Sequence, residues 1–119
     1  MSSPLIQYII LRRDLHDVLK WPLGALIAQG CHASVAALQK FKNNPETVQY
    51  LENCEQMRKV VLSISNKEDL LTLSKELLSS HVDHVVWEEQ PENEPTCLAT
   101  RPYVKTDVSN YFKGLKCFS

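Results

Sequence analysis

One stripe of small and polar side chains has residue types and a spacing that suit chemistry. Ala25, Gln29, His32 and Ala36 recur at intervals of four, three and four residues, which places them on one face of a helix. On that face the Gln29 amide and the His32 imidazole could look into a pocket above the ends of neighbouring strands. Packing of the same face against another helix or a second subunit explains the pattern equally well, so both interpretations stay open.

An acidic segment supplies carboxylates that could join this pair. Residues 88–95 contain four acids and two prolines and directly follow a predicted strand, so we expect them to lie outside regular structure. Functional groups of an open α/β sheet gather beyond the carboxyl ends of its strands, and a carboxylate there could orient water or accept a proton. We therefore predict a pocket formed by Gln29, His32, Glu89 and Thr96, with a simply solvated acidic loop as the alternative.

The other reactive residue types give no further site. Cys31 and His32 are helix neighbours that point about 100° apart, so they cannot act together as nucleophile and base. The histidines and cysteines lack metal-site spacing, and we predict no metal. The sequence has no glycine-rich phosphate loop, no GxSxG and no HExxH, which leaves the nucleotide-binding, α/β-hydrolase and zinc-protease classes without a motif.

Eight segments must position these side chains. Apolar runs predict buried strands at 5–11 and 60–64, and two further strands are expected at 82–87 and 96–100. Helices are predicted at 22–42 and 45–54, from a Ser65–Glu68 capping box through Leu77, and from Thr106 to Leu115. The order β-α-α-β-α-β-β-α predicts a three-layer α/β/α domain whose sheet has parallel first crossovers and an antiparallel last pair, hence is mixed.

Composition fits one soluble globular domain spanning 1–119. The 119 residues include 44% hydrophobic and 23% charged side chains, which excludes disordered and collagen-like chains. Thirteen basic against 14 acidic residues leave no broad basic surface for nucleic acid, so an RNA partner must contact a local patch. The N-terminal residues lack a secretion signal and a membrane span, which predicts a cytoplasmic protein whose four cysteines are reduced core thiols.

Four sequence blocks together carry a resemblance to a known family. They are ILRRDL at 10–15, GALIAQGCHA at 24–33, RKVVL at 58–62 and TCLATRP at 96–102. In order and spacing these blocks resemble the archaeal and eukaryotic (type II) peptidyl-tRNA hydrolases over nearly the whole chain. The segment around Trp21-Pro22 and residues 89–93 is most similar to the eukaryotic peptidyl-tRNA hydrolase domain-containing branch.

The resemblance implies a fold, an activity and a site. It implies a mixed four-stranded sheet between helices, a homodimer, and hydrolysis of the ester that joins a peptide to tRNA, without a cofactor. The catalytic glutamine of the family falls on Gln29, its second threonine on Thr96 and its aspartate most nearly on Glu89. Asn93 is the polar residue nearest to the first threonine position, and it is a candidate for substrate binding together with His32.

One position departs from the family pattern. The family lysine is replaced by Ala25, which cannot donate a hydrogen bond to a developing oxyanion. We expect either that Lys20 or Arg13 supplies the missing charge, or that the chain is a weak or inactive member that serves as an RNA- or protein-binding module. Basic residues are candidates for phosphate contacts, although the first of them could instead pair with Asp14: Arg12, Arg58, Lys59 and Arg101.

Overall fold

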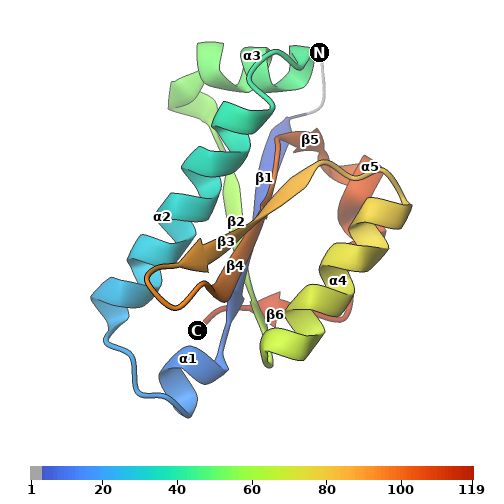
Figure 1. The fold of residues 1–119 in the computed structure, drawn as a ribbon. Helices are drawn as coiled ribbons and strands as arrows, with labels where there is room; N and C mark the ends of the chain where they lie inside the picture. Colours follow the sequence, from blue (N-terminus) through green and yellow to red (C-terminus); the bar gives the residue numbers. More distant parts are fainter. Residues whose placement is uncertain (1–3) are drawn as a thin grey trace.

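Six strands form one mixed sheet in the computed structural model, which describes residues 4–119 (Figure 1). The strands are β1 (Leu5–Arg12), β2 (Lys59–Ile64), β3 (His84–Glu89), β4 (Glu94–Thr100), β5 (Tyr103–Val104) and β6 (Lys116–Cys117). Their order is β3-β4-β1-β2-β6, with β5 beside the start of β1. β1 and β2 are parallel, and every other pair is antiparallel. The mixed character is confirmed, but the expected count of four strands is wrong, because β5 and β6 are too short to show a pattern.

Helices cover both faces of this sheet, as the predicted three-layer architecture requires (Figure 1). On one face lies α2 (Leu23–Lys40), followed by α3 (Pro45–Glu52) and the 3₁₀ turn η1 (Cys54–Gln56). On the other lie α4 (Lys67–Ser79), α5 (Lys105–Val108) and the 3₁₀ turn η2 (Ser109–Phe112). The order of the eight predicted segments is confirmed, and a one-turn helix, α1 (Asp14–Asp17), is added after β1.

Three local predictions need correction. The cap of α4 is Asn66, whose side chain accepts from the Asp69 amide, so the helix is capped one residue later than the predicted Ser65–Glu68 box. The last predicted helix breaks into α5 and η2 after Val108. The acidic segment mostly continues β3 and β4, so that only residues 90–93 form the turn of a tight hairpin.

Two apolar clusters hold the three layers together. The cluster under α4 combines even-numbered β1 residues such as Ile10 with Leu70, Leu77 and Phe112. The cluster under α2 combines the odd-numbered β1 residues with side chains from α1, α2 and β4: Leu15, Leu26, Ala33, Ala37, Cys97 and Ala99. This alternation along β1 is what a strand covered on both faces requires.

The cysteines are unpaired, but most of them are not core residues. Cys97 is buried under α2, whereas Cys31, Cys54 and Cys117 are exposed. The expectation of four core thiols is therefore wrong for three. Within the described range, no helix is long and apolar enough to cross a membrane. Residues 1–3 of the predicted domain lie outside the described residues.

Candidate functional site

The Thr96 hydroxyl and the Gln29 amide meet directly beneath α2. Thr96 Oγ1 donates a hydrogen bond of 2.7 Å to Gln29 Oε1. Both residues are enclosed, with exposed fractions of 0% for Thr96 and 1% for Gln29. Because the hydroxyl occupies the carbonyl oxygen of Gln29, the amide nitrogen Nε2 is left as the donor. This nitrogen makes no hydrogen bond to another residue among residues 4–119.

A β-bulge in β4 explains why Thr96 points at α2. β3 and β4 pair Trp87 with Cys97 and Glu88 with Pro95, so Thr96 is an extra residue opposite no partner. Leu98 belongs to the cluster under α4 and Cys97 to the cluster under α2, so regular alternation would turn Thr96 toward α4. A bulge breaks the alternation and can redirect one side chain. Here it places the Thr96 hydroxyl on the same face as Gln29.

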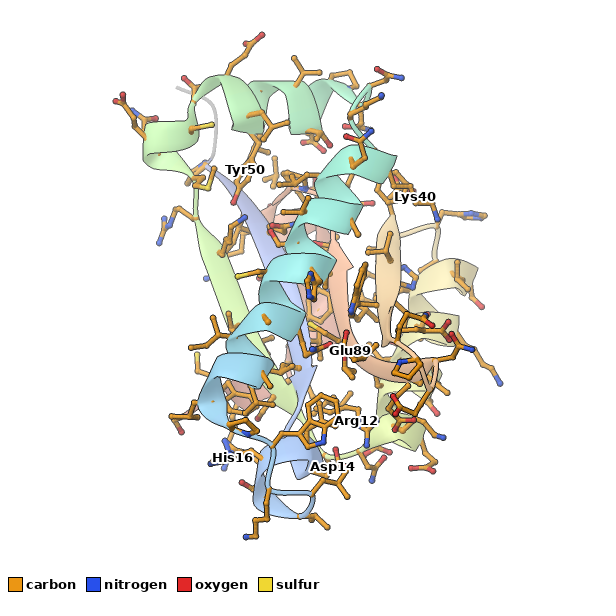
Figure 2. The ribbon with its side chains drawn as sticks, turned by 60° about the vertical axis from the view of Figure 1, so that its left-hand side comes forward. Arg12, Asp14, His16, Lys40, Tyr50 and Glu89 are labelled. Atoms are coloured by element: carbon orange, nitrogen blue, oxygen red, sulfur yellow. The ribbon has the colours of Figure 1, made fainter. Side chains whose placement is uncertain are left out.

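Arg12, at the end of β1, holds the bulge in place through hydrogen bonds to the residues that precede Thr96. Its guanidinium donates to the Pro95 carbonyl at 2.8 Å and to the Glu94 carboxylate, both directly before Thr96. It also makes a two-pronged pair with Asp14, at 3.0 and 2.7 Å, which confirms the internal ion pair considered above. Figure 2 shows Arg12 and Asp14 close together near the lower, N-terminal end of α2. The sequence blocks contained Arg12, but no sequence signal connects it to Thr96.

His32 and Glu89 join the site through Trp87. The His32 ring stacks on Trp87 with 4.7 Å between ring centroids, and Trp87 Nε1 donates to Glu89 Oε1 at 3.4 Å. α2 packs on β3, which brings Glu89 to the side of the hairpin under this helix (Figure 2). Trp87 was not among the predicted site residues. Its place on the α2 face of β3 is the signal that could have identified it, because alternate strand residues share a face.

The site is thus two adjacent groups rather than one hydrogen-bonded cluster. Gln29 touches Thr96, and His32 touches Trp87, which in turn contacts Glu89. Burial raises the pKa of the neighbouring Cys97 thiol to about 12, so this sulfur stays a neutral part of the wall. No three His, Cys, Asp or Glu side chains in the described part of the chain are placed to hold a metal ion.

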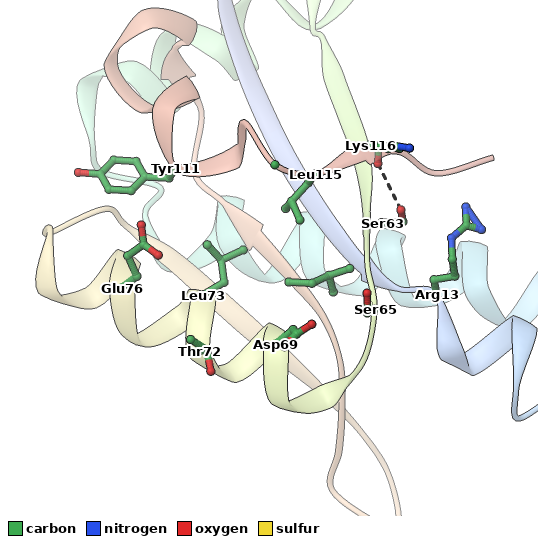
Figure 3. Close-up of a pocket in the computed structure, with 12 residues that line it drawn as sticks. Arg13, Ser63, Ser65, Asp69, Thr72, Leu73, Glu76, Tyr111, Leu115 and Lys116 are labelled. Atoms are coloured by element: carbon green, nitrogen blue, oxygen red, sulfur yellow. Dashed lines mark hydrogen bonds between the residues drawn. The ribbon is translucent and has the colours of Figure 1, made fainter.

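Among the hollows formed by the described residues are two that lie away from this site on the helix-covered faces of the sheet. The larger, about 560 Å³, lies between α4 and β6, where Asp69 and Glu76 of α4 line it together with Arg13 and Lys116 (Figure 3). The second, about 360 Å³, is an apolar groove between α2 and β2, lined by Ile27, Val61 and Phe118 among others. Neither hollow is lined by Gln29 or Thr96.

Comparison with known proteins decides the family. The family model described as peptidyl-tRNA hydrolase PTH2 matches residues 5–118. The chain belongs to this family. Two relatives carry the name "Putative peptidyl-tRNA hydrolase PTRHD1": the mouse protein is 46% identical over 96% of this chain and 82% of its own length, and the human protein 45% over the same shares. The "Peptidyl-tRNA hydrolase" of the archaeon Methanococcus vannielii is 38% identical over 60% of this chain and 58% of its own length.

Within this PTH2 domain, Ala25, which the resemblance places at the family lysine position, lies on the same helix face as Gln29. Ala25 is one turn before Gln29 on α2 and is half-buried. The two cations expected to compensate are engaged elsewhere. Lys20 Nζ donates to the Asp17 carbonyl at 3.1 Å. Arg13 donates to the Ser119 carbonyl at 2.9 and 3.1 Å, and its guanidinium lies 4.8 Å from the centre of the Phe118 ring.

The remaining predicted residue, Asn93, lies in the hairpin turn of the PTH2 domain. It is exposed and has a φ of 56°, a left-handed conformation that asparagine tolerates better than most residues. No hydrogen bond between described residues joins it to the other four predicted site residues. A place in the turn at the edge of the site suits contact with a substrate more than contact with the buried pair.

Most of the basic residues considered for phosphate contacts already bind other residues of the protein. Arg101 is buried, pairs with Glu46 and Asp83, and lies over Tyr103. Lys59 Nζ donates to Gln7 Oε1 at 2.7 Å, and burial lowers the pKa of this amine. Arg12 and Arg101 therefore form no local phosphate-binding patch in their present contacts, whereas Arg58 and Lys59 are exposed and stay candidates for phosphate contacts.

Proposed function

We propose that this PTH2 protein hydrolyses the ester bond between a peptide, or an N-blocked amino acid, and tRNA. The observation that carries the proposal is the orientation of the Gln29 amide. Thr96 occupies its oxygen, which leaves Nε2 as a fixed donor at the site. Ester hydrolysis builds negative charge on the carbonyl oxygen, and a pre-oriented donor at that place stabilises the transition state. The names of the mouse and archaeal relatives support the same reaction.

Each proposed catalytic residue has one role. Gln29 Nε2 donates to the ester carbonyl oxygen, and the Thr96 hydroxyl keeps the amide in that orientation. The Glu89 carboxylate accepts a proton from water as the water oxygen attacks the carbonyl carbon. The bond to the ribose oxygen then breaks, and the same proton passes from Glu89 to that oxygen. Peptide carboxylic acid and free tRNA hydroxyl are the products, so no cofactor enters the balance.

Two further residues are proposed to contact the substrate, and the whole chain 1–119 acts as one catalytic domain. His32 is exposed on α2 and is held against Trp87, so its second ring face and edge can meet a nucleotide or the peptide. Asn93 stands in the exposed hairpin turn beside Glu94 and can donate to a phosphate or a carbonyl oxygen.

A second candidate function is a binding module that keeps the fold without turnover. Ala25 favours it, because an ammonium at that position would stabilise an oxyanion and an alanine methyl group does not. The present contacts of Lys20 and Arg13 favour it also, since both cations already have partners in the protein. Such a module would still bind peptidyl-tRNA or a protein partner.

Single-turnover hydrolysis of N-acetyl-aminoacyl-tRNA separates the two candidates. The parent protein should release the acyl group, and Gln29→Ala should lower the rate about 10²- to 10³-fold, the usual effect of removing one oxyanion donor. Gln39→Ala is the matched control, because Gln39 is exposed on the same helix. A parent that releases nothing, with release gained in Ala25→Lys, would establish the binding module instead.

We further propose that the protein is a homodimer. Support comes from exposed apolar side chains beside the α2–β2 groove, where Leu23, Ile27 and Val61 would be covered by a second copy. Sedimentation velocity should give a dimer mass for the parent and a monomer mass for Ile27→Glu. A monomeric parent at micromolar concentration would refute the dimer.

We also propose that the protein acts in the cytoplasm, where translation produces peptidyl-tRNA. Membership of the PTH2 family supports this location. Imaging of the tagged full-length protein should show diffuse cytoplasmic signal, and accumulation in an organelle would contradict the proposal.

A further inference from the structure

β3 ends the sheet on one side and has no neighbouring strand from residues 4–119 along its outer edge. The sheet order begins with β3, which pairs only with β4. Figure 1 shows β3 at the front of the sheet, between α2 and α4. No backbone or side-chain group of residues 4–119 forms a hydrogen bond with the outward-facing backbone groups of His84–Glu89. Alternate residues of this strand therefore present free N–H and C=O groups.

This edge lacks most of the devices that protect free strands. Proteins usually block an edge with proline, a bulge, a charged side chain or a covering loop. The bulge residue Thr96 and Pro95 both lie on β4, so all six β3 residues keep their N–H groups. Its acids, Glu88 and Glu89, stand only at the carboxyl end. The stretch from His84 to Trp87 thus has the length and the backbone groups to accept another strand.

The carboxyl end of β3 lies at the proposed active site. Trp87 and Glu89 are themselves β3 residues, and they connect the strand to His32. Strands in a sheet lie about 4.8 Å apart, so the outer neighbour of β3 lies about 10 Å from β4 and Thr96. Two extended residues span about 7 Å, which is most of this distance.

We propose that the peptide part of the substrate adds to β3 as an extra strand, parallel to β3, with its carboxyl end beside Glu89; this rests on the proposed function. The direction follows from chemistry, because the scissile ester is at the carboxyl end of the peptide. Peptidyl-tRNAs differ in their side chains but share a main chain. Strand addition recognises the main chain, so it suits a hydrolase that must accept peptides of any sequence.

The test uses N-acetylated oligoalanyl-tRNAs with one to six residues and the full chain. Each main-chain hydrogen bond raises the affinity for the substrate several-fold. We therefore expect kcat/KM to rise about 10- to 100-fold as the peptide lengthens from one to five residues, mainly through a lower KM. N-methylation of the peptide nitrogens that face β3 should remove the gain, while methylation of the intervening nitrogens should not. The effect should therefore alternate with a period of two residues.

If the protein hydrolyses these substrates but kcat/KM does not change with peptide length, the inference is wrong. Methylation effects without the period of two residues would overturn it as well. If no substrate is hydrolysed at all, the proposed function fails, and peptide binding decides the inference separately. An N-acetylated alanine–threonine pentapeptide amide should shift the ¹⁵N amide signals of His84–Glu89 and slow hydrogen exchange at alternate residues. Absence of these shifts, or the same shifts arising from protein concentration alone, would overturn it.

Discussion

Replacing Arg12 by methionine tests how the site is held together. Arg12 has an exposed fraction of 4%, and its guanidinium makes four hydrogen bonds, to Asp14, Glu94 and the Pro95 carbonyl. Methionine fills a similar volume but donates none of them. The change therefore leaves two carboxylates without their cation and one backbone carbonyl without its donor.

The exposure of Asp14 and Glu94 determines how much the substitution lowers the free energy of unfolding. Removing one member of a fully buried ion pair costs about 3–5 kcal/mol, because the other charge is left without compensation. Asp14 and Glu94 are 21% and 32% exposed, so both carboxylates can turn partly to water. We expect Arg12→Met to lower the free energy of unfolding by about 2–4 kcal/mol. Arg12→Lys should recover only part of this loss, because an ammonium cannot reproduce the two-pronged contact with Asp14.

Urea unfolding measures the effect, and Arg13→Met is the matched control. Arg13 is the next residue, but it is one-third exposed, and its ion pair with Asp17 is long, at 3.8 Å. Its replacement should cost less than about 1 kcal/mol. Folded Arg12→Met should also hydrolyse N-acetyl-aminoacyl-tRNA at least about tenfold more slowly, because the Pro95 carbonyl beside the bulge loses its donor and the bulge is no longer held in place. Equal costs for the two variants, or a cost below 0.5 kcal/mol for Arg12→Met, would refute the reasoning.

Three further outcomes are expected. A thiol reagent should modify three of the four cysteines in the native protein and Cys97 only on unfolding, because Cys97 is buried and its pKa is raised to about 12. Rapid reaction of all four cysteines in the native protein would contradict this. Burial lowers the pKa of His84 below its ordinary value of 6.5, so on acidification the unfolded chain takes up the proton before the folded protein does, and the free energy of unfolding should fall as the pH drops below 6.5. Urea unfolding at several pH values should show that His84→Gln loses this dependence on pH and that His81→Asn keeps it. Gly30→Ala should raise the free energy of unfolding by about 0.5–1 kcal/mol, because the added Cβ meets only Ile9 Cγ2 at 3.8 Å; an unchanged or lower urea midpoint would contradict this.

The order and type of the main elements could be predicted because their patterns are long. The apolar run of β1 and the 3.6-residue period of α2 each extend over several residues, which tertiary contacts reinforce. β5 and β6 contain two residues each and exist only through their pairing with β1 and β2. The cap of α4 was misplaced by one residue, because Ser65 and Asn66 are both good capping residues and the backbone decides between them.

The candidate site could be predicted only as a set of residues. The stripe on α2 indicated Gln29, and the family resemblance paired it with Thr96, which the structure places 2.7 Å away. The bulge that makes this contact could not be predicted, because it depends on which residues of β3 and β4 stand opposite each other. Trp87 was missed for a related reason, since its contact with His32 joins two elements that are far apart in the sequence.

The charge distribution around the site determines what chemistry remains open to it. Ala25 carries no charge, and Arg12, the cation bonded beside the bulge, is already shared between Asp14 and Glu94. Its donors are directed to these partners, so it holds geometry rather than an oxyanion. Under the proposed function, stabilisation of the developing charge depends on neutral donors, of which Gln29 Nε2 is the one oriented by the hydrogen bond that its own amide oxygen accepts. A neutral amide donor forms weaker hydrogen bonds to an oxyanion than an ammonium does. Under the proposed function, we therefore expect hydrolysis to be slow, because the donor that the structure orients is neutral.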